Sequence, residues 1–200
     1  MTAPRFRFVF FDVDSTLVTI EGIDELAGGN PEIARLTAAA MNGEVSLDEV
    51  YAKRLEIIRP SLARVTELGE RYRLSLVPGA DETIRSLRQA GVTVHLVTAG
   101  IEQAILPLAN HLGIDERLVH AVRLHFDESG MYRDFDRRSF LVRPGGKELV
   151  VHDLRARSKG RAAFVGDGIS DLEARPAVDL FVGFGGVAVR PRVRDQADVY

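Results

Sequence analysis

The sequence predicts an α/β protein with a Rossmann-like parallel sheet and a small helical domain inserted after the first strand. Short apolar segments rich in β-branched and aromatic residues recur along the chain. Amphipathic segments of helical length separate most of them, an alternation typical of parallel sheets covered by helices. One interval of 80 residues, from Asp12 to Val92, is far longer than the roughly 30 residues that a strand–helix–strand unit needs.

The individual elements follow from these patterns. Buried strands are expected over residues 6–11, 92–97, 161–165 and 178–184. Helices are expected over residues 80–91, 101–113 and 147–160. Gly91 and Gly113 supply C-terminal stops for the first two helices.

The long interval contains helix-start signals. Asn30-Pro31 predicts an N-cap followed by proline in the first helical turn. Ser46 and Glu49 fit a capping box. Ser61 begins a further stretch, which extends to about Arg73. We expect these helices to form a cap over the ends of the strands.

The predicted organisation is a core of residues 1–17 and 78–200 with a cap of residues 18–77. A second, smaller insertion over residues 122–144 is expected to form a hairpin turning at residues 128–130. We find no internal repeat and no low-complexity segment.

Composition excludes several function classes. Lys plus Arg number 26 and Asp plus Glu 29, giving a formal net charge of −3 without a basic tract, so a nucleic-acid partner is not expected. The absence of cysteine excludes disulfides and cysteine metal sites. No apolar stretch approaches the ~20 residues that span a bilayer, and the N-terminus has no signal-peptide core. We therefore expect a cytoplasmic protein without a membrane partner.

Polar residues follow three of the predicted strands. Asp12 and Asp14 end the first, Thr98-Ala99-Gly100 ends the second, and Asp167 and Asp171 follow the third. Ligands of open α/β sheets bind outside the carboxyl ends of the strands. We expect these side chains to converge there.

Converging carboxylates repel each other unless they are protonated or bind a cation. An oxygen-only set without His or Cys suits Mg²⁺, which would attract an anionic substrate. The Thr98 hydroxyl, backbone N–H groups near Gly100 and the Lys147 ammonium are suited to phosphate oxygens. Each motif alone is common in ordinary loops; their order along the chain is what makes the pattern specific.

This ordered set resembles the haloacid dehalogenase superfamily of aspartate-nucleophile phosphohydrolases, and within it the phosphoserine phosphatases. The resemblance covers nearly all of residues 6–200. It is carried by residues 21–27, 40–50, 54–61, 144–147, 166–171 and 182–190. It implies a fold with a haloacid dehalogenase-like core and a cap.

The resemblance implies a role for each residue of the site. Asp12 would be the nucleophile and Asp14 the general acid and base. Mg²⁺ would be bound by Asp12, by the backbone carbonyl of Asp14 and by Asp167, with Asp171 in support. Phosphate would be bound by Thr98, Ala99, Gly100, Lys147 and Ser170.

The cap would select the substrate. Arg54 lies on an apolar helical stripe, where a guanidinium is costly unless it meets an anion. An arginine that reaches solvent is the commoner explanation, but the resemblance implies that Arg54 binds the substrate carboxylate and Glu21 the ammonium group. Met41 and Asn42 would line the same pocket, and Arg190 would make a further contact to substrate or phosphate.

The expected activity is Mg²⁺-dependent hydrolysis of O-phospho-L-serine to L-serine and phosphate, the last step of serine biosynthesis. Alternatives are a phosphatase for another small phosphomonoester and a phosphotransferase with an acceptor such as homoserine. A phosphorylated receiver domain is the non-enzyme alternative, although receivers lack a ~60-residue cap after their first strand. The relatives also imply a homodimer.

The sequence departs from the family pattern at several positions. Thr98-Ala99 stands where Ser-Gly is usual, Leu47 replaces an aromatic residue of the cap, and Asn42 replaces glycine. The chain ends at Tyr200, where the family normally continues into a terminal helix. These departures bear on the preferred substrate rather than on the phosphatase chemistry.

Overall fold

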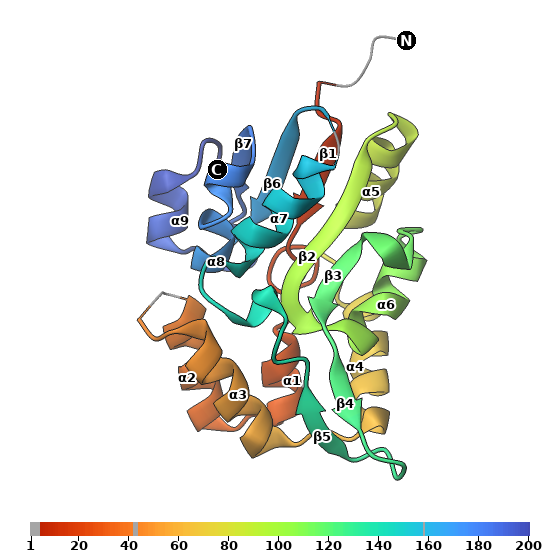
Figure 1. Cartoon of the computed structure of the whole chain (residues 1–200), viewed down its shortest axis with the longest axis vertical. Helices are drawn as coiled ribbons and strands as arrows, with labels where there is room; N and C mark the ends of the chain where they lie inside the picture. The colour runs from red at the N-terminus through yellow and green to blue at the C-terminus, as the bar shows by residue number, and fades with distance from the viewer. Residues whose placement is uncertain (1–4, 42–43, 158) are drawn as a thin grey trace.

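The computed structural model describes residues 5–41, 44–157 and 159–200. Within them a parallel sheet has the strand order β3-β2-β1-β6-β7 (Figure 1). The strands are β1 (Phe8–Phe11), β2 (Thr93–Ile101), β3 (Val119–Val122), β6 (Ala162–Gly166) and β7 (Leu180–Gly183). The strand order confirms the α/β prediction, and β3 is a strand that sequence patterns did not reveal.

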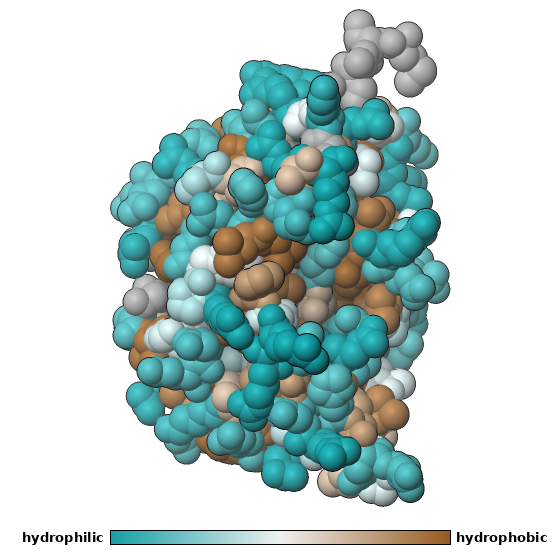
Figure 2. Space-filling view, in the orientation of Figure 1, coloured by the Kyte–Doolittle hydropathy of each residue, from teal (hydrophilic) through white to brown (hydrophobic). Residues whose placement is uncertain are grey.

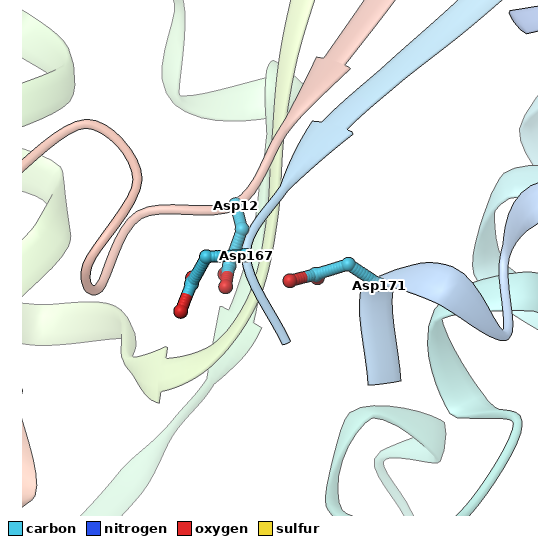
Figure 3. A group of neighbouring side chains, drawn as sticks. All are labelled: Asp12, Asp167 and Asp171. Atoms are coloured by element: carbon cyan, nitrogen blue, oxygen red, sulfur yellow. The ribbon is translucent and has the colours of Figure 1, made fainter. Parts of the chain in front are cut away.

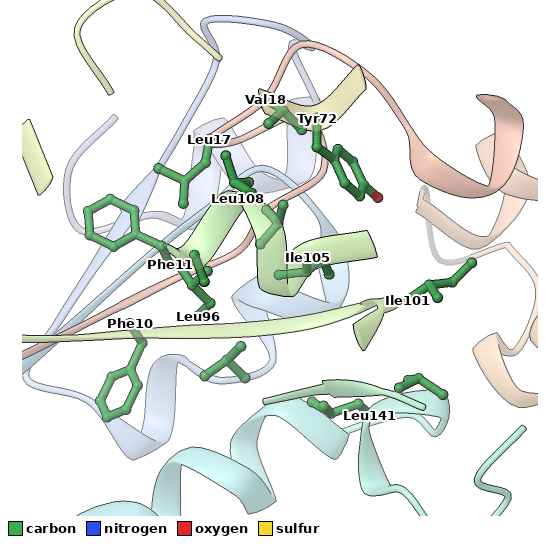
Figure 4. Packing of buried hydrophobic residues seen from close by; sticks show 14 of the residues in the cluster. Phe10, Phe11, Leu17, Val18, Tyr72, Leu96, Ile101, Ile105, Leu108 and Leu141 are labelled. Carbon is green, nitrogen blue, oxygen red and sulfur yellow. The ribbon is translucent and has the colours of Figure 1, made fainter. Parts of the chain in front are cut away.

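Strand β1 lies in the middle of the sheet, with a strand paired to each of its edges and side chains packed on both of its faces. Phe8 pairs with Thr93 on one side and with Ala162 on the other, and all four β1 side chains are buried. Figure 4 shows Phe10 and Leu141 on one side of the β2 ribbon and Ile105 and Leu108 on the other. The core therefore extends across both faces of the sheet.

Helices and short 3₁₀ turns connect the strands. The helices are α5 (Ala80–Gln89), α6 (Glu102–His111), α7 (Gly146–Ala156), α8 (Ile169–Leu172) and α9 (Pro191–Gln196). The 3₁₀ turns are η1 (Glu116–Leu118), η2 (Phe140–Val142) and η3 (Arg175–Ala177). In Figure 1, α7 lies in front of β1 and β6.

A helical layer occupies the lower part of Figure 1, beyond the carboxyl ends of the strands. It contains α1 (Gly22–Ala27), α2 (Pro31–Met41), α3 (Leu47–Ile58) and α4 (Leu62–Leu74). Ser61 caps α4 through a hydrogen bond from Arg64 N at 3.3 Å. Asn30 Oδ1 accepts a hydrogen bond from Glu32 N at 3.0 Å at the start of α2.

The expected capping box at the start of α3 is wrong. Ser46 is the N-cap residue but makes no side-chain cap hydrogen bond. Its hydroxyl donates instead to the carboxylate of Asp48, two residues along. The side-chain orientation that brings the hydroxyl to Asp48 leaves its oxygen without a hydrogen bond from the backbone N–H groups of the first helical turn.

The two chain segments that enter and leave the helical layer lie side by side. Thr19 N donates to Ser75 O at 2.8 Å, and Val77 N donates to Leu17 O at 2.9 Å. Val18 and Leu76 form an antiparallel bridge between these bonds. This pairing joins the helical layer to the sheet through a narrow double-stranded stem.

The predicted hairpin is present as β4 (Leu124–Phe126) and β5 (Tyr132–Phe135), which are antiparallel. It packs against the helical layer: Leu62 N donates to Gly130 O at 2.8 Å, and the Tyr51 and Phe135 rings lie 5.2 Å apart. The layer beyond the strand ends is therefore built from two insertions.

The face shown in Figure 2 is mainly hydrophilic, with apolar side chains gathered near its middle. Exposed apolar residues of the chain include Phe140 in η2 and Leu149 in α7. Among the helices that the structure describes, we find none with the length and apolar character that a membrane crossing requires.

Candidate active site

Three carboxylates meet at the carboxyl ends of β1 and β6. Asp12 follows β1, Asp167 follows β6, and Asp171 projects from α8 (Figure 3). All three are buried, and one oxygen of each lies within 4.8 Å of one oxygen of the others. The backbone N–H of Asp12 donates to Val165 O at 3.0 Å, so the sheet itself fixes the separation of the strand ends.

Lys147, in the first turn of α7, supplies the positive charge. Its Nζ lies 2.9 Å from Asp12 Oδ1 and also forms a close ion pair with Asp171 Oδ1. Burial alone would lower the pKa of Lys147, but attraction to Asp12 and Asp171 raises it above its usual value. Lys147 therefore stays charged. We call the group formed by Asp12, Lys147, Asp167 and Asp171 the sheet-edge cluster.

The sheet-edge cluster is short of positive charge, with three carboxylates around one ammonium group. Burial and the Asp12 charge raise the pKa of Asp171 well above its usual value, and the same two causes raise the pKa of Asp167. Asp12 Oδ1 is buried and accepts no hydrogen bond from the described residues, although the Lys147 ammonium lies beside it. A metal cation would relieve both defects, so the residues present fit a metal ion.

Within the sheet-edge cluster, the carboxylate oxygens differ in the number of hydrogen-bond and ion-pair partners that they have. Asp171 uses both, since Oδ1 pairs with Lys147 and Oδ2 accepts from Gly168 N at 2.8 Å. Asp167 Oδ1 accepts from Thr16 Oγ1 at 3.0 Å, and Asp167 Oδ2 pairs with Arg190 Nε at 3.0 Å. Asp171 is therefore best placed to orient Lys147, whereas Asp12 keeps an oxygen for a ligand.

Asp14 is turned away from the sheet-edge cluster toward the helical layer. Its Oδ1 accepts a hydrogen bond from Tyr72 Oη at 2.6 Å and one from Gly22 N at 3.3 Å. Burial raises the pKa of Asp14 to about 7, against the lowering effect of the Tyr72 hydrogen bond and with a further contribution from the Asp12 charge. A carboxyl group of this pKa can both donate and accept a proton at neutral pH.

Thr98, Ala99 and Gly100 lie within β2, where the pairing with β3 becomes irregular between Val97 and Ile101, rather than in a turn after the strand. The Thr98 hydroxyl accepts a hydrogen bond from Gly100 N at 3.0 Å. A Cβ atom at Gly100 would lie 2.8 Å from Ile105 Cδ1 and 3.5 Å from Asp14 Oδ2. Glycine therefore allows Ile105 to pack against this part of the strand.

A cavity of about 50 Å³ lies between the strand ends and the helical layer. Its walls are formed by Asp12, Asp14, Glu21, Ile23, Ala40, Arg54, Thr98, Ala99, Gly100, Lys147 and Ser170. The cavity thus brings together nine of the residues that the sequence predicts for the site. It is far smaller than the roughly 300–1,000 Å³ typical of ligand pockets, so the structure is a closed one.

Two charged groups of opposite sign face this cavity from the helical layer. Glu21 precedes α1 and accepts a hydrogen bond from Ser15 Oγ, and burial together with the Asp14 charge raises its pKa well above the usual value. Arg54, on α3, is 6% exposed, and its Nε is buried without a hydrogen-bond partner among the described residues. Burial lowers the pKa of Arg54, but a guanidinium remains charged at physiological pH.

Comparison with known proteins agrees with this geometry. A family model described as haloacid dehalogenase-like hydrolase matches residues 6–179. The chain belongs to the haloacid dehalogenase-like hydrolase family.

Curated relatives and solved structures are similar over almost the whole chain. A chloroplastic phosphoserine phosphatase of Arabidopsis thaliana is 41% identical over 95% of this chain, which spans 66% of that protein. A Bos taurus phosphoserine phosphatase is 37% identical over 96% of this chain and 87% of its own length. A substrate-bound phosphoserine phosphatase complex superimposes with a TM-score of 0.84 at 25% identity, covering 98% of this chain and 92% of that one.

Some predicted residues of this hydrolase lie outside the cavity wall or outside the described structure. Asp167 and Asp171 do not form part of the cavity wall. Arg190 lies between Asp167 and Glu21, with Nη2 4.0 Å from Glu21 Oε1. Asn42 lies outside the described residues, as do the side chains of Met41 and Leu47.

Sequence reasoning missed other residues of the hydrolase site. Tyr72, Ile23 and Ala40 carry no motif: packing of the helical layer brings Tyr72 to Asp14, and it places Ile23 and Ala40 in the cavity wall. Ser15 and Thr16 follow the Asp12–Asp14 pair directly, so the Ser-Thr sequence was a usable signal. They hold Glu21 and Asp167 respectively.

Proposed function

We propose that this protein is a Mg²⁺-dependent phosphoserine phosphatase that hydrolyses O-phospho-L-serine to L-serine and phosphate. The observation that carries the proposal is the closed cavity in which Asp12, Asp14 and Lys147 face Arg54 and Glu21. Reactive groups on one wall and one charge of each sign on the other suit a phosphomonoester of an amino acid. The curated phosphoserine phosphatases with 36–41% identity support the same assignment.

Asp12 is the proposed nucleophile. One carboxylate oxygen attacks phosphorus while the bond from phosphorus to the ester oxygen breaks, giving an aspartyl-phosphate and the seryl alkoxide. A water molecule then attacks the aspartyl-phosphate, and the bond from phosphorus to the Asp12 oxygen breaks to release phosphate. Phosphate-monoester hydrolysis is among the slowest uncatalysed reactions, so division into two steps matters.

Asp14 is the proposed acid and base. With a pKa of about 7 it can protonate the leaving alkoxide in the first step and accept a proton from the attacking water in the second. Tyr72 and Gly22 hold one of its oxygens, which leaves the other directed toward Gly100 and the cavity.

Mg²⁺, when bound by Asp12, the Asp14 backbone carbonyl and Asp167, would supply positive charge that lets an anionic nucleophile approach an anionic phosphate. Lys147, the Thr98 hydroxyl, the backbone at Ala99 and Gly100, and Ser170 are proposed to bind the phosphoryl oxygens. Asp171 holds Lys147 in place. Positioning and charge compensation of this kind provide most of the catalysis in phosphoryl transfer.

Arg54 and Glu21 are proposed to bind the carboxylate and the ammonium group of the substrate. The buried, unpartnered Nε of Arg54 supports the first role. The raised pKa of Glu21 supports the second, because an ammonium group placed beside it would stabilise its charged form. Met41 and Asn42 as pocket residues and Arg190 as a substrate or phosphate contact remain proposals on the resemblance alone.

The division into a core of residues 1–17 and 78–200 and a cap of residues 18–77 is likewise a proposal, supported by the paired stem at Thr19–Ser75 and Leu17–Val77. The 50 Å³ cavity has no room for phosphoserine, so the cap is proposed to move away from the strand ends for entry and release. A homodimer is an expectation from the resemblance, and a cytoplasmic location is an expectation from composition.

The test is phosphate release by the purified chain with Mg²⁺. The panel contains O-phospho-L-serine, O-phospho-L-threonine and a sugar phosphate, with homoserine added in a parallel series. We expect the highest kcat/KM for phosphoserine. A preference for another monoester, or a new phosphorylated product with homoserine, would contradict the proposal.

The nucleophile is tested in the same assay. Asp12→Asn should lower kcat by about a thousandfold or more, because the nucleophile is lost. The matched control is Asp81→Asn, the same change at an exposed carboxylate paired with Arg85 on α5. Appreciable activity of Asp12→Asn would rule out Asp12 as the nucleophile.

A further inference from the structure

Three helices of the cap meet in a row of polar side chains behind Arg54. Arg54 Nη1 on α3 donates a hydrogen bond of 2.9 Å to Thr37 Oγ1 on α2. The Thr37 hydroxyl donates one of 2.6 Å to Asp24 Oδ1 on α1. Arg54 and Thr37 are both buried. We call Asp24, Thr37 and Arg54 the cap relay.

Chemistry fixes the direction of the two hydrogen bonds in the cap relay. A guanidinium can only donate and an ionised carboxylate can only accept, whereas a hydroxyl has one proton and two lone pairs. The proton of Thr37 must therefore point to Asp24, and a lone pair must point to Arg54. Hydrogen bonds that share a hydroxyl in this order polarise one another, which strengthens both.

The cap relay also keeps Arg54 out of a direct ion pair with Asp24. Asp24 is the first acidic group along the relay, yet Thr37 stands between the two charges, and Arg54 has no ion pair within 4 Å among the described residues. A direct carboxylate partner would occupy the planar donor face of the guanidinium. Through the Thr37 hydroxyl, Asp24 orients Arg54 and stabilises its positive charge. The guanidinium is not neutralised by a direct ion pair and can still bind a carboxylate.

Arg54 lines the cavity and has an N–H group without a partner among the described residues. Nε is buried and unpartnered, although buried N–H groups nearly always have partners. Arg54 also lies in the cavity wall with Glu21 and Ala40. The Nη1 group of the guanidinium is therefore held by Thr37, whereas the Nε–H group can still donate to an acceptor.

We propose that Thr37 and Asp24 are positioning residues for substrate selection: their relay aims Arg54 at the cavity and keeps it free to bind the carboxylate of the substrate. The inference rests on the proposed phosphoserine phosphatase function and deepens it. Under this inference, Thr37 and Asp24 do not touch the substrate. They nevertheless contribute to the preference for phosphomonoesters that carry a carboxylate.

The test compares two substrates that differ in one group. O-Phospho-L-serine and O-phosphoethanolamine share the phosphate and the ammonium group, but only the first has a carboxylate. Thr37→Val keeps the shape of the side chain and removes the hydroxyl. We expect it to lower kcat/KM for phosphoserine about tenfold, mainly through KM, since hydrogen bonds to charged groups are worth roughly that factor. The effect on phosphoethanolamine should be much smaller.

Three further variants separate the relay from a general loss of structure. Thr37→Ser keeps the hydroxyl and should restore the ratio of the two kcat/KM values. Thr66→Val makes the same change at an exposed cap threonine whose hydroxyl bonds only within α4, and should behave as wild type. In an Arg54→Ala background, Thr37→Val should have no further effect on the ratio, because the group it positions is gone.

The outcomes distinguish the inference from the function beneath it. A wild-type chain that does not prefer phosphoserine over phosphoethanolamine would overturn both. A strong wild-type preference that Thr37→Val leaves unchanged would overturn the relay and leave the proposed function standing. Equal losses on both substrates in Thr37→Val, with an unchanged thermal unfolding midpoint, would also overturn the relay.

Discussion

The sheet-edge cluster and the cap relay hold buried charge in opposite ways. At the sheet edge, Lys147 contacts Asp12 and Asp171 directly. In the cap relay, a hydroxyl separates Arg54 from Asp24. The difference fits what each region is proposed to do. Reacting groups must keep their positions through turnover, whereas a recognition group must remain unneutralised until the substrate arrives.

The backbone elements that carry the sheet-edge cluster and the cap relay also differ. Asp12 and Asp167 follow adjacent strands, whose ladder fixes their spacing. The cap relay is assembled from three separate helices, which are joined to the sheet through a narrow stem. A rigid platform suits the chemistry, and the cap movement proposed above would suit capture and release of the substrate.

The largest effect on stability is expected when the sheet-edge cluster loses its cation. Lys147→Met keeps the length of the side chain but leaves Asp12 and Asp171 buried without their cation. Removing one partner of a buried ion pair typically costs about 3–5 kcal/mol, so the metal-free protein should unfold at much lower urea concentration. Activity with Mg²⁺ should fall at least a hundredfold, because an oxyanion-stabilising group is lost.

Lys53→Met is the matched control for this prediction. Lys53 Nζ lies 3.6 Å from Glu32 Oε1, and both side chains are about half exposed. Exposed pairs contribute about 0–1 kcal/mol, so the urea midpoint should barely move. Equal midpoints for the two variants would show that the sheet-edge cluster does not depend on direct ion pairing.

The sheet-edge cluster was predictable from sequence because strand order brings it together. Apolar segments that end in polar residues identify the strand ends, and parallel strands end at one edge. Asp12, Asp167 and Asp171 could therefore be grouped without coordinates. β3 escaped detection since Val119–Val122 is a four-residue segment with a histidine, too short for a periodic signal.

The cap relay was only partly predictable. The apolar stripe of α3 drew attention to Arg54, and Val50, Tyr51 and Leu55 beside it are buried. Thr37 and Asp24 gave no signal, since their contacts depend on how three helices pack rather than on spacing within one. Ser46 shows the same limit locally, because a competing carboxylate two residues away decides where its hydroxyl points.

A smaller effect is expected where the helical layer contacts Asp14. Tyr72 of α4 donates to Asp14 of the sheet edge, and Tyr72→Phe removes that hydroxyl while keeping the ring. We expect kcat to fall about tenfold, because a hydrogen bond to a charged group is worth roughly one such factor. KM should change little, since Tyr72 does not form part of the cavity wall.

Tyr51→Phe is the control for Tyr72. The Tyr51 hydroxyl is also buried but has no partner among the described residues, so its removal should leave kcat unchanged and stability equal or slightly higher. If Tyr51→Phe and Tyr72→Phe lose kcat to the same extent, the contact between the cap and Asp14 has no special part in the chemistry.

The smallest expected effect concerns a buried histidine that is kept neutral and has no ion-pair partner of opposite charge. His95 on β2 packs 5.0 Å from the Phe10 ring, and its Nδ1 lies 3.1 Å from His120 Nε2. Burial, with a contribution from His120, lowers the pKa of His95 to about 4 from 6.5. The unfolded chain therefore binds a proton at this residue between pH 6.5 and 4 that the folded chain excludes.

It follows that the stability contributed by neutral His95 is present above pH 6.5 and is lost as the pH falls toward 4. His95→Leu should flatten the decline in unfolding free energy between pH 7 and pH 5 by about 1–2 kcal/mol in urea titrations. His152→Leu, at an exposed position on α7, should leave the slope unchanged. An equally steep decline in His95→Leu would show that the acid sensitivity arises at groups other than His95.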